Sequence, residues 1–461
     1  MPQVRRSPLG RLSFVACLAF WSFIAPTPAT ASESLCDASF QNCRTPLLSL
    51  INAEKIRIDV AFDMMEDTVI ANALISRFKA GVRVRVIMDP RRNSVSSQNA
   101  VVLQKLKDAG IPMRGKSSGA SMHWKFMIFE GQQKLEAGAA NFSDYYFIPV
   151  QPYLNYTDEA IYFTDDPPIV DSFKTRMDDA WTGTSLTNYA NVTGTLVREY
   201  DKFPVSSALC FVPWQNFSTL SVPRYDAETS RIDVIMYKIT EASHADGLIR
   251  AAKRGVPVRL IVEPSWYRNA SNVWQAYQVD RLYAAGVQIR VRAHAGFTHQ
   301  KTVLLYGQGM SIIGSSNWTS DSNKAQFEHN YFSLKSWMFS WLKANFTRKW
   351  TNSTGNVETK AFTPLPPDKP VNSTPANLAN RQPVTGLSLV WKSGPWAWKA
   401  DIYFGTSANP PLYASNVSVS AAATKKYALP TLTAGKTYYW KIVSKTMANK
   451  TATGPIWSFG T

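Results

Sequence analysis

The chain carries one sequence pattern twice, and this duplication constrains its fold more than any other feature. The segment RIDVAF begins at Arg57, and RIDVIM begins at Arg231, 174 residues later. KAGVRVRVIMDP and KRGVPVRLIVEP follow at the same separation, so that Asp89 corresponds to Glu263. Because solenoid repeats are only about 20–50 residues long, a repeat of this length predicts two similar lobes instead.

Each copy contains alternating strand and helix patterns. IRIDVAF and VRVRVIMD are rich in alternating β-branched residues, which predicts two strands. The segment between them, EDTVIANALISRFKAG, has apolar residues at helical spacing and stops at Gly81, and a further helix is expected through VVLQKLKDAG. The strand–helix–strand order predicts an α/β fold of two duplicated lobes, with mixed or largely parallel sheets covered by helices.

A second repeated pattern carries the chemistry. In both copies a His-x-Lys pair is followed by an asparagine 18 residues after the histidine; these residues are His123, Lys125 and Asn141, and then His299, Lys301 and Asn317. Imidazole can attack phosphorus or donate a proton near neutral pH. Lysine neutralises phosphate oxygens, and amide and hydroxyl groups donate hydrogen bonds to developing charge. Two histidines on opposite sides of one phosphate would cleave a phosphodiester without a metal or cofactor.

These motifs resemble the signature of the phospholipase D superfamily, H-x-K-x4-D followed by G-S-x-N, and the resemblance covers most of residues 50–350. It implies two lobes packed about a pseudo-twofold axis, with both motifs in one cleft. It also implies that His123 is the nucleophile, which forms a phosphohistidine, and that His299 is the general acid. Lysine and asparagine would bind the phosphate. An acid that orients the opposed histidine is expected after each asparagine, at Glu328 and, by repeat alignment, at Glu159.

The sequence departs from the family pattern at three positions. Glu130 and Tyr306 replace the motif aspartate, whose role in the family is mainly structural. Ala139 replaces the motif serine in the first copy, whereas Ser315 retains it in the second, so the site is expected to be asymmetric. The candidate catalytic set is therefore His123, Lys125, Asn141, Glu159, His299, Lys301, Ser315, Asn317 and Glu328.

The N-terminus has the features of a secretory signal peptide. A basic segment precedes a short apolar run, Leu12 to Ile24, and a small-x-small cleavage site ends at Ala31. The apolar run is too short to span a membrane comfortably, although an uncleaved anchor is the alternative interpretation. We therefore expect an exported, extracellular protein.

The C-terminal part has a different composition. A Pro-, Ser- and Asn-rich stretch precedes short alternating strands that predict an all-β sandwich. LTAGKTYYW resembles the tyrosine-corner segment of fibronectin type III domains, with Tyr438 at the corner. The predicted domains are a signal peptide at 1–31, lobe 1 at 32–195, lobe 2 at 196–361, a Pro-rich linker at 362–380 and a fibronectin type III-like domain at 381–461.

Cysteines and glycosylation motifs agree with an exported chain. Cys36 and Cys43 could close a small loop and leave Cys210 free, but three cysteines allow three single pairings, and no Cys-x-x-Cys zinc motif is present. The chain has eleven Asn-x-Ser/Thr sequons. Two of them are Asn141 and Asn317, which we expect to be unmodified because a glycan there would fill the cleft; an occupied site in glycopeptide mapping would contradict the catalytic assignment.

Charge and pattern leave the substrate open. The chain has a net charge of +17; without the signal this becomes +14, of which +8 lies from Ala376 onward. A basic C-terminal domain favours an anionic surface. Phospholipid head groups are the first expected substrate and nucleic acid the second, because alternating arginines in RVRV and VQIRVR could line a polyanion groove or a solvated sheet edge. A non-catalytic binding protein is the third interpretation, which the loss of serine at Ala139 favours. Nothing in the sequence indicates an oligomeric state.

Overall fold

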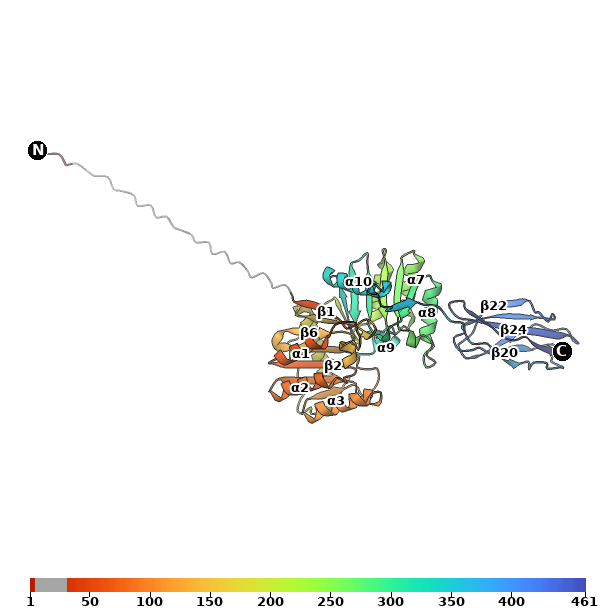
Figure 1. Cartoon of the computed structure of the whole chain (residues 1–461), viewed down its shortest axis with the longest axis horizontal. Helices are drawn as coiled ribbons and strands as arrows, with labels where there is room; N and C mark the ends of the chain where they lie inside the picture. The colour runs from red at the N-terminus through yellow and green to blue at the C-terminus, as the bar shows by residue number, and fades with distance from the viewer. Residues whose placement is uncertain (5–30) are drawn as a thin grey trace. The chain divides into compact units, whose positions relative to one another are not determined.

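The computed structural model describes residues 1–4 and 31–461 (Figure 1). The predicted signal peptide therefore lies almost wholly outside the described residues. Within the described ranges, no helix combines the length and the apolar character needed to cross a membrane.

Lobe 1 is built on an eight-stranded sheet with the order β1-β8-β6-β5-β2-β3-β4-β9. Its strands are β1 (Glu33–Asp37), β2 (Arg57–Phe62), β3 (Arg83–Met88), β4 (Met113–Gly115), β5 (Lys125–Phe129), β6 (Lys134–Ala137), β8 (Ala160–Thr164) and β9 (Thr187–Ala190). Its helices are α1 (Arg44–Ala53), α2 (Thr68–Lys79), α3 (Ser97–Asp108), α4 (Asp144–Phe147) and α5 (Pro167–Thr182), with 3-10 turns η1 (Pro90–Ser94) and η2 (Glu130–Gln132).

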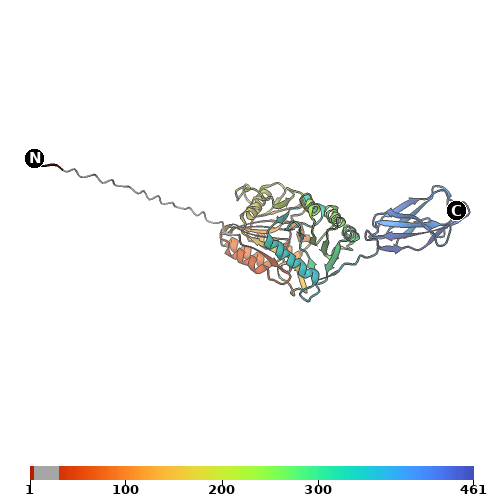
Figure 2. The ribbon, with the colours of Figure 1, turned by 90° about the horizontal axis from the view of Figure 1, so that it is seen from above.

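Lobe 2 repeats this topology strand for strand, in the order β10-β17-β16-β15-β11-β12-β13-β18. Its strands are β10 (Leu209–Val212), β11 (Ile232–Met236), β12 (Val258–Val262), β13 (Gln288–Arg292), β15 (Thr302–Leu305), β16 (Met310–Gly314), β17 (Glu328–Ser333) and β18 (Thr359–Ala361). Its helices are α6 (Phe217–Ala227), α7 (Ala242–Lys253), α8 (Trp274–Ala284), α9 (Ser320–Lys324) and α10 (Ser336–Thr351), with η3 (Pro264–Trp266). The predicted duplicated α/β architecture is confirmed, and Figure 2 shows the helices of both lobes around their sheets.

The sheets are mixed, which confirms one of the two expected forms, and the alternative of a largely parallel sheet is wrong. In lobe 1 the parallel pairs are β2–β3 and β3–β4, and the other neighbours are antiparallel. The strand–helix–strand pattern was present only in the first half of each repeat. In the second half a short hairpin joins β5 to β6, and the other antiparallel neighbours are brought together by longer connections.

The two lobes share a hydrophobic core. One buried cluster contains Trp124, Phe126 and Phe173 from lobe 1 together with Phe211 and Phe327 from lobe 2. A further link is a parallel pair between β7 (Asn155–Asp158) and β14 (Ala295–Thr298). Because the lobes share a hydrophobic core and a strand pair, the sheet edges that carry the two His-x-Lys motifs are held against each other.

The C-terminal residues form a β-rich unit of two sheets. Its strands are β19 (Val371–Thr374), β20 (Ser388–Lys392), β21 (Lys399–Gly405), β22 (Leu412–Ser418), β23 (Thr424–Ala428), β24 (Thr437–Lys445), β25 (Thr451–Thr453) and β26 (Trp457–Gly460). β19 pairs with β20, so residues assigned to the linker contribute a strand. The Tyr438 hydroxyl accepts a hydrogen bond from the Thr433 backbone N–H at 2.9 Å, the contact expected at a tyrosine corner.

Candidate active site

Strand direction brings each motif to one edge of its sheet. His123 and Lys125 stand at the start of β5, and Asn141 follows the end of the neighbouring antiparallel strand β6. Glu159 directly precedes β8, which is antiparallel to β6. The start of one strand lies beside the end of its antiparallel neighbour, so these four side chains gather at the same edge. Lobe 2 repeats the arrangement with β15, β16 and β17.

The two edges face a single cleft. Both histidines and both asparagines line it, two from each lobe. All four side chains are more than nine-tenths buried, which leaves a small part of each open to the cleft. The structure therefore brings the two sequence motifs into one site.

Each histidine is held by the glutamate of the other lobe. The distance from His123 Nδ1 to Glu328 Oε2 is 2.9 Å, and the distance from His299 Nδ1 to Glu159 Oε1 is 2.5 Å. Backbone contacts fix these crossed pairs, because each histidine N–H donates to the carbonyl of the residue before its glutamate, Phe327 or Asp158. With Nδ1 engaged, Nε2 is the ring nitrogen left for a substrate.

The two lysines are fully enclosed cations next to the histidines. Lys125 Nζ donates to the His123 carbonyl at 2.8 Å, and Lys301 Nζ donates to the His299 carbonyl at 2.5 Å. Burial lowers the pKa of Lys125 to about 8 and that of Lys301 to about 7. Burial and these lysine charges also hold the pKa of both histidines well below the usual value. Such a cluster is suited to an anion, which would offset the cost of burying the ammonium groups.

The two glutamates differ in pKa, and the altered motif is one source of the difference. Burial raises the pKa of Glu159 to about 8 and that of Glu328 to about 7. The Asp158 charge also raises the pKa of Glu159, and the Ser322 hydroxyl lowers the pKa of Glu328. Ser315 Oγ donates to Glu328 Oε2 at 2.5 Å, which favours the ionised carboxylate. Ala139 cannot supply the same bond to Glu159, and one buried oxygen of each glutamate, Glu159 Oε2 and Glu328 Oε1, has no hydrogen-bond partner.

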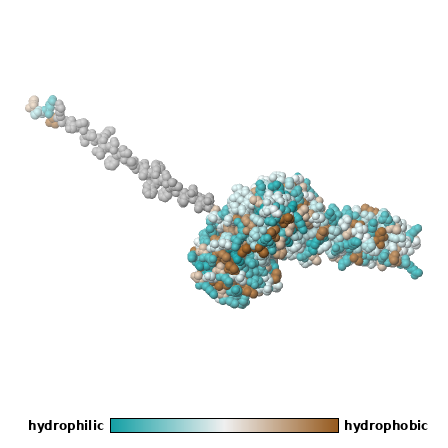
Figure 3. Space-filling view, viewed as in Figure 1, coloured by the Kyte–Doolittle hydropathy of each residue, from teal (hydrophilic) through white to brown (hydrophobic). Residues whose placement is uncertain are grey.

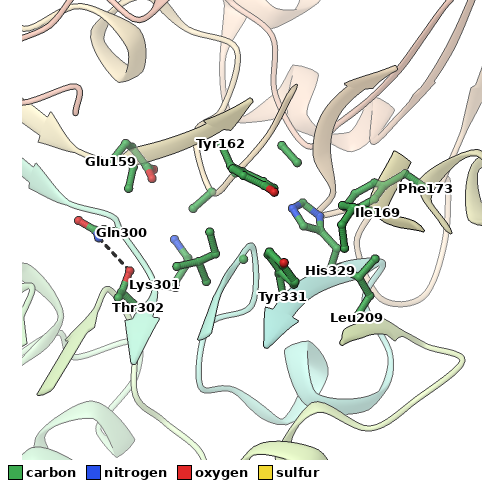
Figure 4. A pocket seen from close by; sticks show the side chains of 16 residues that line it. Glu159, Tyr162, Ile169, Phe173, Leu209, Gln300, Lys301, Thr302, His329 and Tyr331 are labelled. Atoms are coloured by element: carbon green, nitrogen blue, oxygen red, sulfur yellow. Dashed lines mark hydrogen bonds between the residues drawn. The ribbon is translucent and has the colours of Figure 1, made fainter. Parts of the chain in front are cut away.

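A small cavity adjoins this altered position. It is bordered by Ala139, Glu159, Lys301 and His329, and the space that water centres can occupy is about 20 Å³. Figure 4 shows Glu159 and Lys301 on one side and His329 on the other, between aromatic and aliphatic side chains. A space of this size can hold about one water molecule.

The other two departures have structural partners. Glu130 forms an ion pair with Lys174 at 3.0 Å, and the Tyr306 hydroxyl donates to Asp233 at 2.6 Å. Neither residue lines the catalytic cleft. These contacts agree with a structural role for the replaced aspartate.

The remaining histidines and the strand arginines take no part in the cleft. His244, His294 and His329 are buried elsewhere. The arginines of the two basic strands have partners within the fold, and the Arg83 side chain, at 58% exposed, also faces solvent. The partners are Asp59 and Asp178 for Arg85, Glu199 for Arg83, Glu263 for Arg292, and the hydroxyl and carbonyl of Thr359 for Arg290. Arg259 on β12 forms a further pair with Asp233.

Several cleft residues were missed by sequence reasoning. They are Asp63, Arg92, Tyr146, Tyr237, Lys238 and Trp266. Four of these follow the carboxyl ends of parallel strands at matching repeat positions, where ligands commonly bind in α/β sheets. Their position after the predicted parallel strands could have identified these four residues from the sequence. Within the described residues, no group of three histidine, cysteine or acidic side chains could hold a metal ion.

The cysteine pairing left open by the sequence is resolved as a disulfide between Cys36 and Cys43. Cys210 is buried and unpaired in the described structure.

The aromatic segment beginning at Trp337 belongs to α10, which buries Met338, Leu342 and Phe346 against the shared core.

Two relatives match a part of the chain. The chain is 26% identical to the mitochondrial cardiolipin hydrolase of Chlamydomonas reinhardtii over 124 residues, which are 27% of this chain and 51% of that protein. It is also 26% identical to the mitochondrial cardiolipin hydrolase of Xenopus laevis over 187 residues, 38% of this chain and 79% of that protein. The matched segment thus spans only about half of the algal relative.

A solved structure has a similar fold. Phosphatidylserine synthase from Haemophilus influenzae Rd KW20 superposes with a TM-score of 0.54 at 11% identity, covering 72% of this chain and 87% of that chain. The family model described as "Cardiolipin synthase, PLD-like domain" matches residues 47–181 and 226–350, which is more than half of the chain and includes both motifs. The chain therefore belongs to this phospholipase D-like family.

Proposed function

We propose that the protein is a phosphodiesterase that hydrolyses phospholipid head groups through a phosphohistidine on His123. The crossed pairing of each histidine with the opposite lobe's glutamate carries this proposal. It leaves two imidazole Nε2 atoms for a phosphate that lies between the lobes, with Lys125 and Lys301 beside it.

The number of protons that each histidine–glutamate pair holds supports the assignment of nucleophile and acid. A nucleophile needs a free Nε2 lone pair, so its pair should hold one proton fewer than the pair that acts as the acid. Glu328 ionises more readily than Glu159, because the Ser315 and Ser322 hydroxyls stabilise its carboxylate, whereas the Asp158 charge opposes the ionisation of Glu159. The His123–Glu328 pair is thus suited to attack, and the His299–Glu159 pair is suited to keep its proton.

The reaction follows from this arrangement. The lone pair of His123 Nε2 forms a bond to phosphorus while the bond from phosphorus to the leaving oxygen breaks, and that oxygen takes the proton from His299 Nε2. Water then gives a proton to His299 and attacks phosphorus, and the P–N bond breaks to restore neutral His123. Lys125, Lys301 and the asparagine amides stabilise the charge on the equatorial oxygens.

Phospholipid is favoured over nucleic acid by the surroundings of the site. Three of the strand arginines that a polyanion groove would need are engaged inside the fold, Arg85 and Arg292 with carboxylates and Arg290 with Thr359. The curated relatives are named as cardiolipin hydrolases, and the solved neighbour is named as a phosphatidylserine synthase. A binding protein without turnover would not need two opposed histidines, each with its own buried glutamate.

The predicted export and the accessory domain complete the proposal. We infer a secreted enzyme, although the relatives are named as mitochondrial. The fibronectin type III-like unit, whose excess of lysine and arginine gives it a strong positive charge, would bind an anionic surface such as a membrane. In Figure 3 the face in view carries scattered hydrophobic patches interrupted by polar residues.

The test is hydrolysis of phospholipid micelles in EDTA by the mature protein and by His123→Ala and His299→Ala. Loss of one proton-transfer or nucleophilic group should lower kcat by at least about 10²-fold. Quenching in alkaline denaturant, in which the P–N bond of phosphohistidine is stable, should trap phosphoenzyme in the wild type and none in His123→Ala. Activity that EDTA abolishes and divalent ions restore would contradict the mechanism. Cleavage of single-stranded DNA with no lipid hydrolysis would establish the nuclease instead.

A further inference from the structure

Residues at matching repeat positions of the two lobes line the two walls of the cleft, but their side chains differ in charge and in aromatic character. Asp63 and Arg92 in lobe 1 correspond to Tyr237 and Trp266 in lobe 2, each 174 residues later. Each pair follows the same two parallel strands, and all four side chains line the catalytic cleft. The duplication thus provides an internal comparison of the two sides of one site.

The lobe 1 wall is ionic, and the lobe 2 wall is aromatic and cationic. Arg92 Nε donates to Asp63 Oδ1 at 2.6 Å. The rings of Tyr237 and Trp266 meet edge to face at 5.9 Å, and Lys238 Nζ lies 4.0 Å from the Trp266 ring centroid. Lys238 occupies the position that Met64 has in lobe 1. The charge of Arg92 is therefore neutralised by Asp63, whereas Lys238 forms no ion pair within the described residues, although Asp321 also lines the cleft.

The aromatic wall lies on the side of His299. The ring centroids of Tyr237 and His299 are 4.7 Å apart, and Tyr146 from lobe 1 contacts the same histidine at 5.0 Å. In an in-line displacement the attacking and leaving atoms stand on opposite sides of phosphorus. If His123 attacks, the leaving alcohol faces His299 and extends along Tyr237, Lys238 and Trp266.

We propose that Tyr237, Lys238 and Trp266 form the leaving-group subsite, and that this subsite selects a phospholipid leaving alcohol with a second anionic group over one with an ammonium group. The inference rests on the proposed function and adds a direction and a charge preference to it. The bond that breaks is the P–O bond to this alcohol, and the proton comes from His299.

The preference follows from the position of the lysine. A quaternary ammonium binds well on a tryptophan face when no other cation is present. Here the Trp266 face already lies next to the Lys238 ammonium, which would repel such a group and attract a phosphate. Lys238 is half-buried, and burial lowers its pKa, so an anionic partner would also offset its lost hydration.

The experiment compares three lipids in the same detergent micelles, in EDTA, at low salt. Cardiolipin, phosphatidylglycerol and phosphatidylcholine have leaving alcohols with a negative, neutral and positive charge. We expect kcat/KM to fall in that order. Lys238→Met, which copies Met64 of lobe 1, should lower the value for cardiolipin by about tenfold and leave phosphatidylcholine unchanged or improved. Lys253→Met removes the same charge from an exposed position at the end of α7 and should change nothing.

The possible results separate the inference from the function. If Lys238→Met lowers kcat/KM equally for all three lipids, or if phosphatidylcholine is the best substrate, the subsite is wrong and the lipid function stands. If no lipid is hydrolysed, the lipid function is wrong. The subsite is then tested with dithymidylate with and without a terminal 3′-phosphate on the leaving nucleoside, where an advantage of the phosphorylated form that Lys238→Met removes would support it, and equal rates would overturn it.

Discussion

Restoring the missing serine in lobe 1 should change how the catalytic acid titrates. In lobe 2, Ser315 Oγ donates to the buried Glu328. At the equivalent position Ala139 has no donor, and Glu159 Oε2 is buried and unpaired. Ala139 and Glu159 border the same small cavity, so the hydroxyl of Ala139→Ser has space to reach the carboxylate.

The size of the effect can be derived from the pair that already has the serine. Burial raises the pKa of Glu159 to about 8 and that of Glu328 to about 7, a difference of about one unit or 1.4 kcal/mol. A hydrogen bond to a charged group contributes about 1.5–3 kcal/mol, so a serine hydroxyl is large enough to produce a shift of this size, although the Asp158 charge at Glu159 and the Ser322 hydroxyl at Glu328 also contribute to the observed difference. We expect Ala139→Ser to lower the pKa of Glu159 by about one unit.

The sign of the pH effect follows from the role of the pair. The His299–Glu159 pair acts as an acid only while it holds its proton, so activity falls as pH rises through its pKa. A decrease of about one unit reduces the protonated share at pH 8 from about one half to about one tenth, and at pH 7 from about nine tenths to about one half. The variant should therefore lose about fivefold in kcat/KM at pH 8 and about twofold at pH 7.

The assay is the pH profile of kcat/KM, which reports the ionisations of the free enzyme. The alkaline limb should move down by about one unit in Ala139→Ser. Ser315→Ala is the matched control: it removes the bond from Glu328, raises its pKa, and should move the acidic limb upward instead. An alkaline limb that stays in place in Ala139→Ser would refute the proposed effect of the serine on Glu159.

The remaining predictions concern stability. Lys349 and Asp158 form an ion pair in which both side chains are about 1% exposed. Lys349→Met leaves a buried charge uncompensated and should cost about 3–5 kcal/mol in urea unfolding, with partial recovery on adding Asp158→Asn; an unchanged midpoint would contradict this. The disulfide between Cys36 and Cys43 closes a short loop with a separation of 7 residues. Replacing both cysteines by serine should lower the free energy of unfolding by about 2.5 kcal/mol, and no loss would mean that the loop is ordered without the bond.

Sequence reasoning was strongest where the duplication supplied a check. The paired His-x-Lys motifs and the spacing to Asn141 and Asn317 predicted one shared cleft, which the structure forms. The crossed contacts of Glu159 and Glu328 followed from the family resemblance, because nothing in the local sequence states which lobe an acid will face. Sheet direction was less accessible, since most antiparallel pairs, such as β2 with β5 and β1 with β8, join strands that are distant in the sequence and leave no local signal.

The strand arginines show why a pattern of charged residues alone does not identify a polyanion groove. Arg85 and Arg259 alternate with apolar residues, a pattern that suits a solvent-facing strand surface. Their partners, Asp59 and Asp233, lie on the neighbouring parallel strands, 26 residues earlier in each repeat. A pair formed across strands cannot be recognised from either strand alone. The cleft wall was missed for a related reason, because Asp63 and Tyr237 differ in chemistry and do not look like one repeated position.

Two differences between the lobes, the loss of the serine at Ala139 and the aromatic and cationic wall of lobe 2, both concern the His299 side of the phosphate. The carboxyl that keeps its proton most strongly stands behind His299, and the aromatic and cationic wall flanks the same histidine. Nothing in the repeat requires this coincidence, because Ala139 belongs to lobe 1 and Trp266 to lobe 2. An enzyme that protonates its leaving group from one side needs the acid and the leaving-group wall together. The double exchange of Ala139→Ser with Ser315→Ala moves the proton preference and leaves the wall in place. It should therefore be less active at pH 7 than either single variant, whereas recovered activity would mean that the wall imposes no direction on the reaction.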